Sequence, residues 1–347
     1  GPIKSMFCTA ISFWFQDWRL LSAIQASIQS NNFEGALKYA AKIPEFFYGF
    51  IPVGISFALV HANLIHERYE TAHKLLNSIH SVLPKSAKQA PGDINECIIL
   101  SSWEVSLYFR KKDENQFYAT ILKQMIRSKT LSPSMTCYFL IKLDTAQKKG
   151  YLSTVDLDEW GISQALDIFL DNFDESEMER FLLKGQICFL KKEYKEAIDC
   201  FEQYLKELEI MQGQGTASSA SILAICQIAQ SYSQMNLLDR SLDSLKKALR
   251  LDYLNHGKDN TFVRAELYSL LGNDYFSLLN FDWAEKAYRT SLHIFIEIGN
   301  ASCPSTCHLY RMLHLVYLGR NDPVTAELYK SKQLALERKL GLTLTVP

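Results

Sequence analysis

A helix-pair signature recurs three times in the C-terminal half of the chain, over residues 181–201, 225–245 and 268–288. Each copy holds two small residues twelve positions apart. A small first residue lets the second helix of a hairpin cross closely over the first, and a small second residue lets the next hairpin stack. The sequence therefore predicts a repeat protein built from stacked hairpins. The six small residues are Gly185 and Ala197, Ala229 and Ser241, and Gly272 and Ala284.

Large side chains surround the small residues at matching offsets in every copy. Offsets of three and four positions place residues on one face of a helix, where they can fill the space between the two helices of a pair. The residues four positions before the first small residue are Phe181, Ile225 and Tyr268, and those four positions after the second are Phe201, Leu245 and Tyr288. Three positions before the second small residue stand Tyr194, Leu238 and Phe281.

This pattern resembles the tetratricopeptide repeat, and the best match is the stretch 271–275 followed by 281–288. The second small residues are 44 and 43 positions apart, whereas the standard unit has about 34 residues. Drawn-out repeats of this kind resemble those of kinesin light chains and related adaptors. The extra residues predict loops at 211–219 and 255–260. Generic amphipathic helices in a bundle are the alternative.

A fourth copy is expected over 309–336, where residues 326–330 resemble a shortened form of 284–288. A degenerate last unit is typical of a cap, because its outer face meets water instead of another repeat. Clear repeats thus extend over 178–336.

The N-terminal half carries a weaker form of the same pattern. Ala36 and Ala72 each follow an aromatic residue by three positions, which predicts second helices starting near both. Over 94–170 the pattern is helical but less regular, with large residues at helical spacing: Trp103, Leu107, Phe117 and Ile121. With 15 Gly and 9 Pro and no alternating strand pattern, residues 3–347 are expected to form one all-α, right-handed superhelical solenoid of about seven hairpins. Gly1-Pro2 resembles an expression scar, so we expect a fragment of a longer protein.

Composition favours an intracellular protein, cytoplasmic or nuclear. The eight cysteines are scattered through predicted helices, which indicates reduced and buried thiols. The net charge of −1 gives no attraction to nucleic acid. The longest apolar run, 46–60, has 15 residues and is broken by Gly and Pro, so it is shorter than the roughly 20 residues that span a bilayer. No membrane span is predicted.

No motif indicates catalysis, a metal or a cofactor. The run Cys303 to His308 holds two thiols four positions apart, yet it lacks the paired knuckles and the four ligands that zinc requires. We therefore expect a helix start with buried cysteines. There is no nucleophile elbow and no phosphate-binding loop, and an enzyme is the least favoured class.

The resemblance implies that the first helix of each pair lines a concave face, into which the residue after the first small residue points. Those residues are Gln186, Gln230 and Asn273. A row of amides suits an extended peptide, because each amide can donate to a peptide carbonyl and accept from a peptide N–H. Ordinary solvated polar positions are the alternative. Neighbours expected on the same face are Gln227, Gln234, Glu266, Arg311 and His314.

Two functional hypotheses follow, and neither involves catalysis by this chain. The first is an interaction scaffold or adaptor that binds an extended peptide or helix of a partner protein, within a larger complex. The second is a sensor or regulatory domain of a larger enzyme or switch ATPase. Binding of acidic chaperone tails is disfavoured, because Leu182, Leu183, Cys226 and Leu270 stand where such family members carry lysine, asparagine and arginine.

Overall fold

The computed structural model describes residues 20–29, 33–43, 48, 51, 53–82, 92–109, 112–128, 130, 139, 142–143, 178–213 and 218–340. The chain divides into two compact units, Gly1–Ile121 and Leu122–Pro347. Every element within the described residues is helical or a turn, as the sequence predicts. Whether the two units continue one solenoid stays a prediction.

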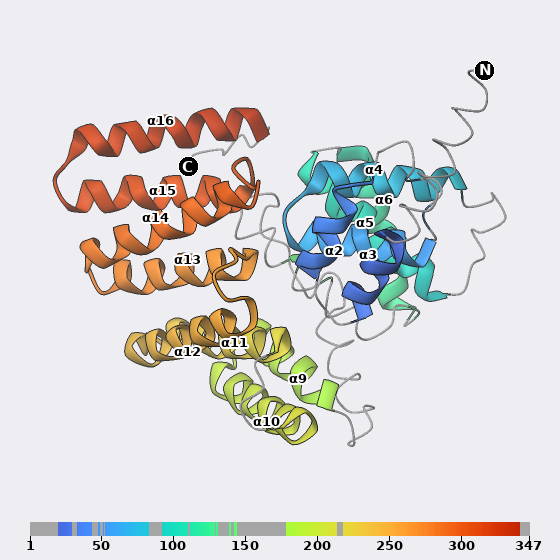
Figure 1. Cartoon of the computed structure of the whole chain (residues 1–347), viewed down its shortest axis with the longest axis horizontal. Helices are drawn as coiled ribbons and strands as arrows, with labels where there is room; N and C mark the ends of the chain where they lie inside the picture. The colour runs from blue at the N-terminus through green and yellow to red at the C-terminus, as the bar shows by residue number, and fades with distance from the viewer. Residues whose placement is uncertain are drawn as a thin grey trace, which may run out of the picture. The chain divides into compact units, whose positions relative to one another are not determined.

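The second unit contains four helix pairs, which form successive layers in Figure 1. Within each pair the two helices pack together, and each second helix also packs on the first helix of the next pair. The first helices are α9 (Met178–Leu190), α11 (Ser219–Gln234), α13 (Phe262–Ser277) and α15 (Pro304–Gly319). The second helices are α10 (Tyr194–Gln212), α12 (Leu238–His256), α14 (Phe281–Glu297) and α16 (Pro323–Leu340).

The turn inside each pair has the same backbone geometry. One residue takes a left-handed conformation two positions before the second helix begins, and φ lies between 56° and 65° in the four turns. Asn tolerates this conformation better than most residues. The four residues are Lys192, Asn236, Leu279 and Asn321. The predicted loops at 211–219 and 255–260 are shorter than expected, because α10 continues to Gln212, α11 begins at Ser219 and α12 continues to His256. Residues 214–217 lie outside the described residues.

The small residues lie where the two helices of a pair cross. A Cβ atom added to Gly185 would come within 2.7 Å of the Phe201 ring, and one added to Gly272 would overlap the Tyr288 ring. Both rings are fully buried. Ala229 is likewise fully buried and packs in one core cluster with Leu245. The second small residues are buried too: Ala197, Ser241 and Ala284.

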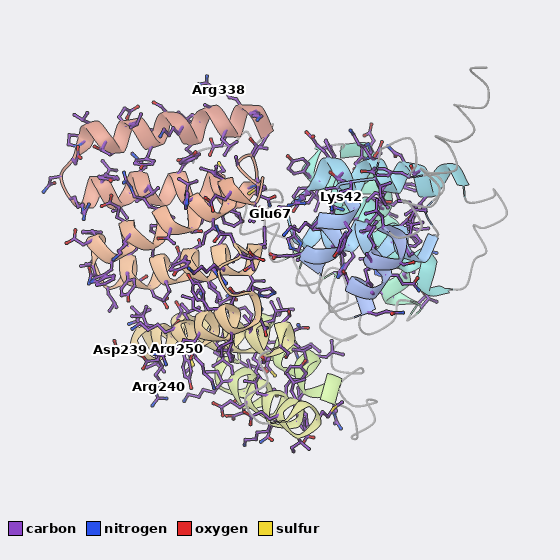
Figure 2. The ribbon with its side chains drawn as sticks, viewed as in Figure 1. Lys42, Glu67, Asp239, Arg240, Arg250 and Arg338 are labelled. Carbon is purple, nitrogen blue, oxygen red and sulfur yellow. The ribbon has the colours of Figure 1, made fainter. Side chains whose placement is uncertain are left out.

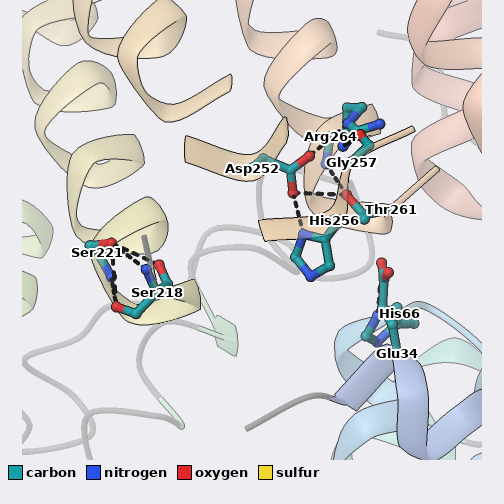
Figure 3. A network of polar contacts seen from close by, with 9 residues as sticks. All are labelled: Glu34, His66, Ser218, Ser221, Asp252, His256, Gly257, Thr261 and Arg264. Carbon is teal, nitrogen blue, oxygen red and sulfur yellow. Dashed lines mark hydrogen bonds and ion pairs between the residues drawn. The ribbon is translucent and has the colours of Figure 1, made fainter. Parts of the chain in front are cut away.

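A buried ionic network connects the end of α12 to the start of α13 (Figure 3). The Arg264 Nε donates to Asp252 Oδ2 at 2.6 Å, and both side chains are 1 % exposed. Thr261 donates to Asp252 Oδ1 at 3.1 Å and also caps α13 by accepting from the Arg264 backbone N–H. The Arg264 guanidinium lies 3.8 Å from the centre of the Tyr253 ring. Adjacent hairpins are therefore joined by paired charges as well as by apolar packing.

Opposing effects act on the Asp252 carboxyl. Burial alone would raise its pKa, but hydrogen bonds from His256 and Arg264 and the guanidinium charge outweigh burial and lower the pKa below 3.8. The carboxylate therefore stays ionised at neutral pH.

The last hairpin lacks the close crossing of the inner repeats. Lys330 stands where the inner repeats carry Phe201, Leu245 and Tyr288, and it is exposed whereas those three are buried. Whether this hairpin is a cap stays a prediction.

The first unit also contains helix pairs. After a helix over 20–29 come α2 (Phe33–Ala40), α3 (Val53–Ile65), α4 (Tyr69–Val82), α5 (Gly92–Tyr108) and α6 (Lys112–Arg127), which continues across the unit boundary. Ala36 and Ala72 lie in the first turn of α2 and α4 and are fully buried, so the two predicted helix starts are confirmed. Trp103 is buried at 1 % exposure. Phe117, another large residue at helical spacing, has a side chain that is 61 % exposed on α6.

Replacing Gly272 by alanine tests the close crossing. The new methyl group would overlap the buried Tyr288 ring, so we expect Gly272→Ala to lower the free energy of unfolding by about 1–3 kcal/mol in urea denaturation. Gly54→Ala on α3 is the control, because its Cβ meets nothing within 4 Å. A Gly272→Ala protein as stable as the wild type would contradict the crossing.

Replacing Arg264 by leucine tests the ionic network. The change leaves the buried Asp252 carboxylate without its guanidinium partner, so we expect the free energy of unfolding to fall by about 3–5 kcal/mol. Arg250 is an exposed arginine on α12, the helix that carries Asp252, and Arg250→Leu should change stability by less than about 0.5 kcal/mol. Equal effects of the two substitutions would mean that the network contributes nothing specific.

Candidate functional site

The four first helices of the second unit share one incompletely covered face, which we call the open face. Its residues recur at intervals of three and four, and none of them is fully buried, whereas the residues between them are mostly packed in the core. The open face comprises Leu182, Leu183 and Gln186 on α9; Leu223, Cys226, Gln227, Gln230 and Gln234 on α11; Glu266, Ser269, Leu270 and Asn273 on α13; and His308, Arg311, Met312 and Leu315 on α15.

Helix α11 contributes the middle of this face. It begins with a capping box in which the Ser218 side chain accepts from the Ser221 backbone N–H at 3.1 Å and Ser221 accepts in return from Ser218 (Figure 3). The cap fixes where α11 starts, and hence the direction in which its side chains point. Leu223 on the first turns is 55 % exposed, although its apolar side chain would be expected in a core.

Gln230 and Cys226 lie one turn apart on α11. The Gln230 Nε2 donates to the Cys226 sulfur at 3.9 Å, which is a weak interaction because sulfur is a poor acceptor. Burial, together with the nearby Glu266 carboxylate, raises the pKa of the Cys226 thiol to about 12. The thiol is therefore neutral, and the Gln230 amide is loosely held.

Asn273 on α13 is held more firmly. Its Oδ1 accepts a hydrogen bond from the Tyr288 hydroxyl at 2.8 Å, so the carbonyl side of the amide is used inside the hairpin. The Asn273 NH₂ group remains as the donor on the open face. Asn273 thus has a structural role that the sequence pattern does not reveal.

His314 lies inside its hairpin, although the sequence placed it on the concave face. It occupies the first small-residue position of the fourth repeat, twelve positions before Ala326. Its Nδ1 donates to the Ala326 carbonyl at 2.9 Å, which ties α15 to the first turn of α16. Leu315, which is 37 % exposed, occupies the open-face position that follows the first small-residue position. Arg311 is on that face, where its guanidinium contacts the His308 ring at 3.0 Å.

Leu223 is a residue of the open face that is not among those predicted from the sequence. It lies four positions before Gln227 and seven before Gln230, so helical spacing was a signal that could have identified it. Gln186, Gln227, Gln234 and Glu266 are part of the open face as defined above, and their contact with a partner stays a prediction.

Charge is divided unequally between the two kinds of helix. The second helices α10, α12, α14 and α16 carry between five and seven Asp, Glu, Lys or Arg residues each. Three of those on α12, Asp239, Arg240 and Arg250, and Arg338 on α16 are labelled in Figure 2. By contrast, α11 has no charged residue and α15 has only Arg311.

The cysteine cluster forms a helix start, as the sequence predicts. Cys303 is the N-cap of α15, Pro304 is its first residue, and Cys303 and Cys307 are both buried. Over the residues that the structure describes, no group of three or more His, Cys, Asp or Glu side chains gathers as a metal site would require. In the same part of the chain, no helix combines the length and the apolar character needed to cross a membrane.

No protein-family model matches the chain, and no curated protein matches it in sequence. Several solved structures do match. A Rap protein complexed with competence and sporulation factor has a TM-score of 0.52 and 13% identity, over 83% of this chain and 77% of that one. BtubC from P. vanneervenii has a TM-score of 0.43 and 15% identity over 94% of both chains. The TPR-like repeats of a Podosopora anserina putative kinesin light chain have a TM-score of 0.41 and 13% identity, over 60% and 97%.

At these identities the likeness concerns the fold alone. The repeated hairpins, the close crossings and the shared turn geometry, together with the likeness to the Rap protein, show a fold of stacked helical hairpins similar to that of tetratricopeptide-repeat proteins.

Proposed function

We propose that this protein is a non-catalytic interaction scaffold that binds an extended segment of a partner protein along the open face, within a larger complex. The observation that carries this proposal is the row of amides at one position of successive first helices, Gln186, Gln230 and Asn273. The likeness to a Rap protein solved with competence and sporulation factor supports it at the level of fold.

The amides can contact an extended backbone at intervals. Directly packed helices lie about 8–10 Å apart, and successive first helices are joined mainly through the second helix between them. Because an extended chain advances about 3.3 Å per residue, one amide per hairpin can meet a bound segment at intervals of three residues or more. Each free amide can donate to a peptide carbonyl and accept from a peptide N–H. Recognition of this kind therefore depends mainly on the backbone of the bound segment.

Pull-down with paired variants tests the proposal. Gln186→Ala with Gln230→Ala removes two amides that have no tight partner in the described structure, so we expect stability to change by less than about 0.5 kcal/mol. Losing two hydrogen bonds of about 0.5–1.5 kcal/mol each should weaken partner binding about tenfold or more. Asn273 is left intact, because its replacement would also remove the partner of the buried Tyr288 hydroxyl.

The matched control is Gln203→Ala with Asn255→Ala, which removes two exposed amides from second helices. Proteins retained from a lysate of the source organism are compared by quantitative mass spectrometry. A partner that is lost with the open-face variant and kept with the control supports the scaffold. A partner kept by both variants contradicts binding at the amides. If the wild type retains nothing specific, the sensor domain of a larger enzyme or switch ATPase becomes the better hypothesis.

A further inference from the structure

Asp274 is a buried carboxyl that lies between the second and third hairpins. It belongs to α13 and is 2 % exposed. Its Oδ1 accepts a hydrogen bond from the Ser233 hydroxyl of α11 at 2.7 Å, and the Ser241 hydroxyl of α12 hydrogen-bonds the same carboxyl. Its Oδ2 has no hydrogen-bond partner among the described residues. One acidic side chain therefore contacts both helices of the preceding hairpin, and it does so through neutral groups.

Asp252, at the same junction, is a buried carboxyl of the opposite kind. Burial favours the neutral form of both carboxyls. At Asp252 the hydrogen bonds from His256 and Arg264 outweigh burial and lower the pKa. At Asp274 burial outweighs the two serine hydroxyls and raises the pKa above 3.8. The difference follows from the partners, because Asp252 faces a buried guanidinium at 2.6 Å and Asp274 faces hydroxyl groups.

The helices packed on α13 bring no opposite charge to Asp274. These helices are α11, α12 and α14. Burial raises the pKa of the Tyr288 hydroxyl on α14 and the nearby Asp274 raises it further, so this hydroxyl is neutral. The other titratable or charged side chains in the adjoining turns do not contribute to the pKa of Asp274: Tyr232 on α11, Asp239, Arg240 and Asp243 on α12, and Tyr275 on α13.

We propose that Asp274 is a proton-binding site of the folded protein, and that loss of this proton weakens the contact between the second and third hairpins. With the proton bound, the carboxyl is neutral and keeps its hydrogen bonds to Ser233 and Ser241. Without the proton, a full charge is buried with no counter-ion, which is costly. In the unfolded chain the same carboxylate is hydrated, so ionisation favours opening of this junction. The proposal is independent of partner binding at the open face.

The expected pH dependence has a defined direction. Because burial holds the pKa of Asp274 above its unfolded value, the folded protein binds the proton more tightly than the unfolded chain does. The stability that Asp274 contributes is fully present below the unfolded value of about 3.9, and it is lost as pH rises through the folded value. Asp252 acts in the opposite direction, because its lowered pKa means that its contribution is lost as pH falls.

Urea unfolding of the whole chain between about pH 4 and pH 8 tests the proposal. Asp274→Asn keeps the shape of the side chain but cannot ionise, and it leaves Asp252 unchanged. We expect the urea midpoint of this variant, relative to the wild type, to rise with pH. Asp243→Asn is the matched control, because Asp243 is exposed on α12, and its midpoint relative to the wild type should not change with pH. A difference for Asp274→Asn that is constant, or that falls as pH rises, would overturn the proposal.

A carboxyl titration followed by NMR, with aspartate labelled with carbon-13, gives a direct readout. We expect one carboxyl to titrate above the ordinary aspartate range, and its signal to be missing in Asp274→Asn. Ser233→Ala removes a hydroxyl that lowers the pKa of Asp274, so it should move this titration to higher pH. If Asp274→Asn does not fold, the shift with Ser233→Ala decides alone. Aspartate signals that all titrate in the ordinary range, or none that responds to Ser233→Ala, would contradict a proton-binding site at Asp274.

Discussion

The close crossing of the two helices in each hairpin sets the geometry of the second unit. At Gly185 and Gly272 the backbone of a first helix lies directly against an aromatic ring of the second helix, with no room for a Cβ atom. Those rings, Phe201 and Tyr288, are fully buried, and dense packing of this kind resists displacement. Because the crossing point is the same in successive repeats, the residue after the small one always emerges on the same face.

In the stacked hairpins, the first and second helices expose different kinds of side chain. The second helices carry most of the charge, which favours solubility. The first helices are left with an open face of amides and apolar side chains. Between hairpins, the buried pair of Asp252 and Arg264 adds a directional contact, because a buried ion pair is stable only in its correct geometry. It joins the second and third hairpins in a defined register.

Much of this fold can be predicted from the sequence, because the small residues recur in phase with large ones. The starts of α10, α12 and α14 at Tyr194, Leu238 and Phe281 follow directly from that phase. The fourth repeat is harder, because His314 stands at its first small position and gains a hydrogen bond to the Ala326 carbonyl instead of a close crossing. The exposure of Phe117 could not be predicted either, since helical spacing does not indicate which faces a neighbour covers. On the open face, the repeat pattern indicates the amides, but it does not indicate Leu223, because only tertiary packing decides that this apolar side chain stays uncovered.

We expect a partner to bind the first helices and not the charged second helices. Photo-crosslinking distinguishes the two surfaces, with a benzophenone amino acid placed at position 223 on α11 or at position 328 on α16, two sites of similar exposure. Position 223 should give covalent partner adducts and position 328 should give none. Adducts from position 328 alone would place the partner on the charged helices and refute binding at the open face.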